Sequence, residues 1–163
     1  LNIQNSGSDG LDLDFSTGEI GSLACHNIGN DCLDASESKA TIDRLQVLFA
    51  KDKAISAGEN SNLMVKNAEI LDSDLGIVSK DGATVEIGFL FSSGLKLDFA
   101  AFVKKTVYGE PTLNILESEN ALFGLASEKS VINIPNDSML TRLHSLQIEG
   151  KMYGNQYGVK TIK

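Results

Sequence analysis

Residues 10–14 read Gly10-Leu11-Asp12-Leu13-Asp14, and a similar pattern returns every 22 residues along the chain. A step of 22 from Leu11 reaches an apolar residue each time, and the members of this file are Leu11, Leu33, Ile55, Ile77 and Phe99. Self-similarity at a fixed period is typical of a repeat architecture, in which each unit buries its apolar side against the next. The chain is therefore predicted to be a stack of units of about 22 residues.

Three further apolar files follow the same period, with one residue added between the second and third units. Their members are Ile20, Ile42, Val65 and Ile87; Leu23, Leu45, Ala68 and Leu90; and Cys25, Val47 and Ile70. Apolar residues also alternate with polar ones within a unit, and a period of two predicts short strands with one buried face. Turn-forming residues separate these runs, for example at 27–31 and 58–62.

Three short strands and their turns within about 22 residues make one coil of a parallel β-helix. Residues one coil apart then become ladder neighbours, about 4.8 Å apart. A leucine-rich repeat would need a fixed Asn and a Leu-x-x-Leu-x-Leu core, and neither is found. A helical repeat is also excluded, because no segment before residue 135 keeps a period of 3.6. We predict an all-β fold, a single-stranded right-handed parallel β-helix, over residues 1–134.

The files loosen after Ile87, and two irregular segments follow. Residues 103–111 contain Lys104, Lys105, Tyr108 and Pro111 and are predicted to form a loop inserted between coils. Residues 135–163 are predicted to be a C-terminal cap and tail with a short helix, because an open β-helix end needs covering. Asn136, Asp137 and Ser138 are its candidate N-caps, and its apolar face would hold Met139, Leu140, Leu143 and Leu146. No cap precedes the first coil, so we expect the parent protein to continue on that side.

Acidic residues are concentrated at the start of the chain. The net charge is −8, and residues 1–38 contain no Lys or Arg. The seven acids of that segment are Asp9, Asp12, Asp14, Glu19, Asp31, Asp34 and Glu37. Such a field repels nucleic acid and anionic lipid, so neither is expected as a partner. No apolar run is long enough to span a membrane, and membrane insertion is not expected.

The cysteines and histidines give no recognisable active site. Cys25 and Cys32 are too few for a disulfide framework and match no zinc spacing, so we expect two separate thiols, with Cys25 in the core. His26 would point to the opposite face of a strand from Cys25. His144 has no partner at a useful spacing, and no Ser/His/Asp arrangement is present.

Several coil segments resemble a known superfamily. They are Gly29-Asn30-Asp31-Cys32-Leu33-Asp34, Lys53-Ala54-Ile55-Ser56-Ala57-Gly58-Glu59 and Gly76-Ile77-Val78-Ser79-Lys80-Asp81-Gly82. They resemble right-handed β-helix repeats of the pectate-lyase-like superfamily, and more narrowly β-helices of large bacterial proteins that carry a spore-coat-H-type kinase domain. The segments 102–109 and 153–158 fit the narrower pattern. The resemblance implies a secreted or cell-surface bacterial location and a link to carbohydrate. It implies no catalytic residue, because Arg44 and Arg142 stand in unmatched places.

The acidic cluster is the first candidate site. Asp12 and Asp34 are one coil apart, as are Asp9 and Asp31, and Asp14 follows on the same strand as Asp12. Neighbouring carboxylates repel each other unless a cation or a proton intervenes. Three interpretations remain open: a solvated acidic edge, a calcium site formed by Asp9, Asp12, Asp14, Asp31 and Asp34, or an acid/base pair for glycoside chemistry among Asp12, Asp14 and Asp34.

Charged residues form a second row, one coil apart, at Glu37, Glu59 and Asp81. Lys39 and Lys80 are their candidate counter-ions, and the row is expected to be a charged turn edge with surface ion pairs. Asp31 and Lys53 are likewise one coil apart and are expected to pair.

These features predict a non-catalytic scaffold or recognition module of a larger bacterial surface or secreted protein, with carbohydrate or another domain of the same parent chain as partner. No cofactor other than calcium is indicated. A recognition module should show a broad, shallow surface stripe without a deep pocket. The alternative is a fragment of a polysaccharide lyase or glycoside hydrolase that uses the Asp cluster, with or without calcium. A homodimer through the β-helix ends is also expected.

Overall fold

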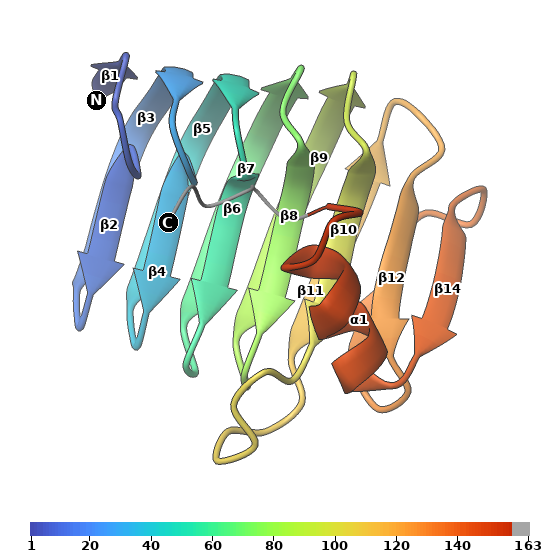
Figure 1. The fold of residues 1–163 in the computed structure, drawn as a ribbon. Helices are drawn as coiled ribbons and strands as arrows, with labels where there is room; N and C mark the ends of the chain where they lie inside the picture. Colours follow the sequence, from blue (N-terminus) through green and yellow to red (C-terminus); the bar gives the residue numbers. More distant parts are fainter. Residues whose placement is uncertain (158–163) are drawn as a thin grey trace.

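The computed structural model describes residues 1–157, which form a parallel β-solenoid of about six coils. Two seven-stranded parallel sheets line it (Figure 1). Sheet A contains β1 (Asn2–Gln4), β3 (Thr17–Ile28), β5 (Lys39–Ala50), β7 (Asn62–Leu71), β9 (Thr84–Ser93), β11 (Thr112–Ser118) and β13 (Val131–Asn133). Sheet B contains β2 (Leu11–Asp14), β4 (Leu33–Ser36), β6 (Lys53–Gly58), β8 (Leu75–Lys80), β10 (Leu97–Phe102), β12 (Phe123–Ser127) and β14 (Met139–Leu143). The predicted right-handed parallel β-helix with coils of about 22 residues is confirmed.

The apolar files of the sequence become ladders that line the interior. Leu11 pairs with Leu33, Leu33 with Ile55, Ile55 with Ile77 and Ile77 with Phe99. The interior files of sheet A, such as Ile42 and Val65, pack against them in one continuous core. Each fully buried Leu or Ile contributes about 1.5–3 kcal/mol.

Each coil holds two strands where three were predicted. Two of the predicted runs, such as those around Ile42 and Val47, belong to the single strand β5. Asp43 and Arg44 lie between them and are both exposed, so the alternation of buried and exposed residues shifts there by one position. No turn former separates the two runs, and the strand therefore continues.

Left-handed backbone recurs at two corners of successive coils. One corner has positive φ at Asn5, Asn27, Phe49, Asp72 and Gly94, and the other at Phe15, Glu37, Glu59 and Asp81. Asn, Asp and Gly tolerate this conformation best. The Asn27 side-chain amide also donates to the Asn5 side-chain oxygen at 2.7 Å, which links two coils at the first corner.

The segment predicted as an inserted loop lies between β10 and β11, and it folds back over the second corner. The backbone N–H groups of Lys104 and Lys105 donate to Oδ1 of Asp81 at 2.6 and 2.7 Å. The Lys105 ammonium pairs with Glu59, and the Tyr108 hydroxyl donates to Glu37 at 3.1 Å. The predicted charged row therefore exists, but its partners come from this loop. Lys80 instead donates to the hydroxyl of Ser56 at 3.0 Å.

A short C-terminal helix is present, at a different place from the one predicted. Met139–Leu143 is strand β14, paired with β12, and helix α1 spans Ser145–Met152. His144 is its N-cap and forms a capping box with Gln147. Ile148 and Met152 pack on the outer face of sheet B against a group that includes Phe102, so α1 covers the side of the solenoid (Figure 1). The apolar residues among 139–143 are spaced as in a helix, but the edge of β12 offers backbone hydrogen bonds to this segment. Pairing with β12 therefore makes it a strand.

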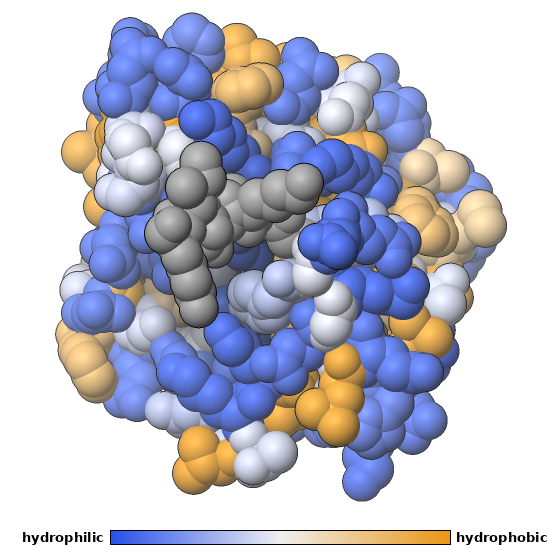
Figure 2. All heavy atoms as spheres, in the orientation of Figure 1, coloured by the Kyte–Doolittle hydropathy of each residue, from blue (hydrophilic) through white to orange (hydrophobic). Residues whose placement is uncertain are grey.

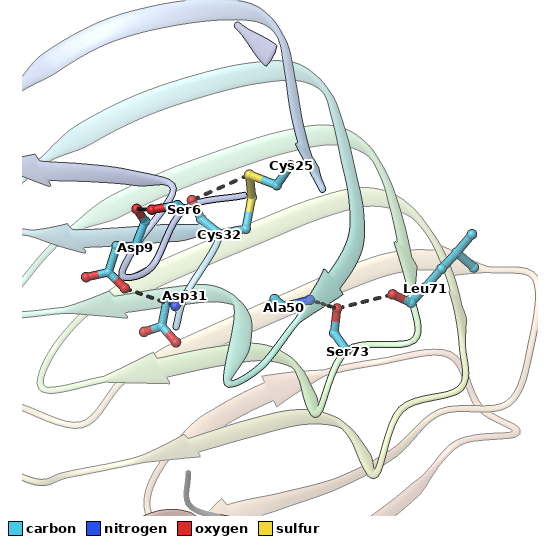
Figure 3. The surroundings of a disulfide bond; sticks show 8 residues. All are labelled: Ser6, Asp9, Cys25, Asp31, Cys32, Ala50, Leu71 and Ser73. Carbon is cyan, nitrogen blue, oxygen red and sulfur yellow. Dashed lines mark hydrogen bonds between the residues drawn. A yellow bond between two sulfur atoms is a disulfide. The ribbon is translucent and has the colours of Figure 1, made fainter. Parts of the chain in front are cut away.

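The two cysteines form a disulfide bond, so the prediction of separate thiols was wrong. Cys25 points into the core from β3, and Cys32 lies immediately before β4 (Figure 3). The chain turns from sheet A to sheet B between them, and this turn brings their Cα atoms to 5.9 Å. That separation lies in the range a disulfide requires. A spacing of seven residues does not by itself predict this contact, because the contact depends on where the coil turns from one sheet to the other.

Removing this disulfide should lower the free energy of unfolding by about 2.5 kcal/mol, the entropy of closing a short loop. The change is Cys25→Ala with Cys32→Ala, and guanidinium unfolding with and without reductant is the measurement. Reductant should shift the unfolding midpoint of the natural chain and leave that of the double variant unchanged. Equal midpoints for the natural chain in both conditions would contradict this prediction.

Candidate functional site

The predicted acidic cluster lies on the outer face of sheet B, over its first coils. Asp12 of β2 is paired in register with Asp34 of β4, and Asp14 with Ser36. Partial burial and the charges of Asp14, Asp34 and Asp9 raise the pKa of Asp12 above its ordinary value. This side of the molecule is mainly hydrophilic over the N-terminal coils (Figure 2). The structure therefore brings Asp12 and Asp34 together as neighbours.

The carboxylates of Asp9 and Asp31 are each held by hydrogen bonds to the next coil. Oδ1 of Asp9 accepts the backbone N–H of Asp31 at 2.9 Å (Figure 3). The same oxygen accepts the side-chain amide of Asn30 at 2.7 Å. Oδ1 of Asp31 accepts the backbone N–H of Lys53 at 2.9 Å. Each carboxylate thus accepts a hydrogen bond from a backbone N–H of the following coil. Within residues 1–157 no three His, Cys, Asp or Glu side chains are grouped closely enough to hold a metal ion, and the calcium site stays a prediction.

A buried ion cluster lies beside this acidic face. The Lys53 ammonium is 3.3 Å from Oδ1 of Asp31 and also pairs with Asp52, so the predicted Asp31–Lys53 pair is confirmed. Burial raises the pKa of Asp31 to about 6 despite the opposing charge of Lys53. Burial alone would lower the pKa of Lys53, but Asp31 and Asp52 together raise it. The ring of Tyr153 lies 5.6 Å from the Lys53 nitrogen. Neither Asp52 nor Tyr153 was predicted from the sequence to belong to this cluster.

The outer face of sheet A carries a second candidate surface, which the sequence analysis did not identify. One open hollow of about 350 Å³ lies over β3, β5 and β7, and another of about 390 Å³ lies over β5, β7 and β9. Both hollows share Gln46 and Glu69, which are ladder neighbours and joined by a hydrogen bond of 3.0 Å. The two hollows therefore form one shallow depression across several coils, called here the sheet A groove.

The sheet A groove is lined by polar and apolar side chains in similar number, with an aromatic edge. Its lining includes Arg44, Gln46, Asn67, Glu69, Phe89 and Phe91. Amides, a guanidinium and a carboxylate supply both hydrogen-bond donors and acceptors. Phe89 and Phe91 lie at its β9 side. A sequence signal did exist: Gln46 and Glu69 occupy the same outward position in consecutive coils, once the added residue is counted.

No described helix is both long and apolar enough to cross a membrane. No family model, curated protein or solved structure matches this chain. The chain is defined by its architecture, a right-handed parallel β-solenoid of about six coils.

Proposed function

We propose that this chain is a non-catalytic recognition module that binds an extended carbohydrate along the sheet A groove. The observation that carries this proposal is the groove itself, which is shallow, open and continuous over adjacent coils. Sugar hydroxyls both donate and accept hydrogen bonds, and Gln46, Asn67 and Glu69 supply the complementary groups. Phe89 and Phe91 offer apolar surface to the carbon–hydrogen faces of a sugar ring.

The regular coil spacing supports an elongated ligand. Equivalent outward positions recur at each ladder step, about 4.8 Å apart, so a chain molecule can meet one side chain per coil along its length. At one such position these side chains are Arg44, Asn67 and Phe89. Repeat solenoids commonly use such extended surfaces for binding. The resemblance of the coil segments is the basis for a further proposal, that the module belongs with pectate-lyase-like β-helices, including those that accompany spore-coat-H-type kinase domains, as part of a larger bacterial protein.

The disulfide supports a location outside the cytoplasm. Disulfides form and persist in secreted and surface proteins, while cytosolic thiols are kept reduced. The Cys25–Cys32 bond is buried in the core and is part of the fold. A secreted or cell-surface location of the parent protein is therefore proposed, with carbohydrate as the ligand.

The test is binding to a panel of neutral and acidic polysaccharides, measured by calorimetry. Gln46→Ala with Glu69→Ala should weaken the affinity for a bound polysaccharide at least about fivefold, since two hydrogen bonds contribute about 1–3 kcal/mol. Glu128→Ala with Asn136→Ala is the matched control, because both side chains are exposed and lie outside the groove. Unfolding midpoints should show that both double variants fold. The proposal fails if no polysaccharide binds, or if both double variants bind equally well.

A polysaccharide lyase or glycoside hydrolase activity is the second candidate, favoured by the raised pKa of Asp12 beside Asp34. A raised pKa favours the protonated form of a carboxyl group, which is the form that can act as an acid. The same panel, assayed for newly released reducing ends, distinguishes the two functions. Turnover that disappears in Asp34→Asn would support the enzyme and contradict the non-catalytic module.

A further inference from the structure

One buried lysine of this solenoid is held against a carboxyl group from the preceding coil. Lys53 and Asp31 are one coil apart, and their side chains are each only 4% exposed. The Lys53 nitrogen lies 3.3 Å from Oδ1 of Asp31. Since the same oxygen accepts the backbone N–H of Lys53, the carboxyl group is fixed in position on the lysine's own strand. The amine and the carboxyl carbon are therefore held close together.

A second carboxylate completes the cluster. Asp52 pairs with the Lys53 ammonium, and its Oδ1 is buried without a hydrogen-bond partner among residues 1–157. Two carboxylates thus surround one ammonium in a nearly dry enclosure. The aromatic ring of Tyr153 lies 5.6 Å from the Lys53 nitrogen and edge-on to the buried ring of Phe102. Burying this unbalanced set of charges is costly, and a reaction that removes two of them relieves that cost.

We propose that Lys53 and Asp31 join in an intramolecular isopeptide bond, with Asp52 carrying the proton. Asp52 accepts a proton from the Lys53 ammonium, and the neutral amine attacks the carboxyl carbon of protonated Asp31. The new C–N bond replaces a C–O bond, and Asp52 returns its proton to the departing hydroxyl, which leaves as water. Asp52 then takes the second proton that the nitrogen loses, so the products are a neutral amide, one water molecule and a protonated Asp52. No oxidant, reductant or nucleotide is needed.

The protonation states support this reaction. Burial raises the pKa of Asp31 to about 6, so its protonated form is accessible near neutral pH. The pKa of Lys53 is raised by its two carboxylates, so the ion pair is the starting state and the proton must pass to Asp52 first. The product amide replaces a charged pair by a neutral group and links neighbouring coils covalently on the sheet B side.

The other lysines offer no comparable site within the described chain. The side chains of Lys66 and Asp43 are both more than half exposed, and Lys96 and Lys105 also lie at the surface. Water keeps such amines protonated. Lys80 is half-buried, but its nitrogen donates to a Ser56 hydroxyl, which offers no carboxyl carbon. Lys53 combines an enclosed amine with a carboxyl group held beside it and a second carboxylate that can carry the proton.

The test is the intact mass of the chain after reduction of the disulfide. The expected mass is lower than the sequence mass by one water molecule. Trypsin should then leave Leu1–Lys39 joined to Asp52–Lys66, because a bonded Lys53 is not cleaved and residues 1–38 contain no earlier cleavage site. Asp31→Asn should instead lose one ammonia, since the same attack on an amide releases it.

Three variants define the mechanism. Lys53→Met and Asp31→Ala should show the full mass of their sequences, and Asp52→Ala should do so if Asp52 carries the proton. Lys80→Met is the matched control and should keep the linked peptides. Full mass in the natural chain, with normal cleavage at Lys53, would overturn the proposal and leave a buried ion pair. A loss of water without the linked peptides, as in a succinimide, would overturn it as well.

Discussion

Replacing Lys53 by Met is expected to lower the free energy of unfolding by about 3–5 kcal/mol at pH 8. Met fills a similar volume, so the loss comes from charge. Asp31 and Asp52 remain buried without the cation that they surround. Removing one partner of a buried pair is far more costly than removing an exposed one. Where the proposed isopeptide bond has formed, its absence from the variant adds to this loss.

The loss should become smaller as the pH falls to 5. Burial already raises the folded pKa of Asp31 to about 6, above its unfolded value, and the opposing effect of Lys53 is gone in the variant. A carboxyl group with a raised folded pKa gives its full stability below the unfolded pKa and loses it as the pH rises through the folded one. At pH 5 the folded variant therefore holds a neutral Asp31, and at pH 8 a buried charge forms.

Urea unfolding of both chains at pH 5 and pH 8 is the measurement, since each comparison is made at one pH. Lys80→Met is the matched control on the same face, because the Lys80 nitrogen contacts a hydroxyl group and, among residues 1–157, no carboxylate within ion-pair distance. Its effect should be much smaller. Adding Asp31→Asn and Asp52→Asn to Lys53→Met should recover part of the loss. An equal loss at both pH values would contradict the assignment to buried charge.

The sequence predicted the coil because its interior repeats. Leu11, Leu33 and Ile55 occupy one ladder, and a period of 22 gives the register of sheet B directly. The Asp31–Lys53 pair was predictable for the same reason, as its members are also one coil apart. Contacts along a ladder depend only on the period, so the sequence contains them.

Contacts across a corner or over a face were not predictable in this way. The Cys25–Cys32 disulfide depends on the curvature of a corner, and Tyr153 reaches Lys53 from far along the chain. The sheet A groove is formed by outward-pointing side chains, and these positions do not have to be apolar. They therefore leave no repeating apolar pattern in the sequence. In the sequence, the groove is marked by Gln46 and Glu69, which are ladder neighbours. They stand 23 residues apart instead of 22, because one residue is added between their coils.

Phe99 marks where the simple period ends, and replacing it by Ala should cost about 3–5 kcal/mol. A further step of 22 would reach Ala121, but the structure pairs Phe99 with Gly124, because the segment that contains the inserted loop changes the spacing. Phe99 is fully buried at this point in the core. A Cβ atom at Gly124 would lie 2.3 Å from the Phe99 ring, so the glycine makes room for the ring.

This fit makes the two positions interdependent. Gly124→Ala alone should cost about 1–3 kcal/mol through overpacking. In Phe99→Leu the smaller side chain leaves space, so Gly124→Ala should cost clearly less in that background. Phe89→Ala on the outer face of sheet A is the control, with a small effect expected because Phe89 is 36% exposed. Guanidinium unfolding of the four chains of this cycle measures the coupling. Strictly additive losses would mean that the ring of Phe99 does not occupy the space above Gly124. The pairing of Phe99 with Gly124 would then be wrong.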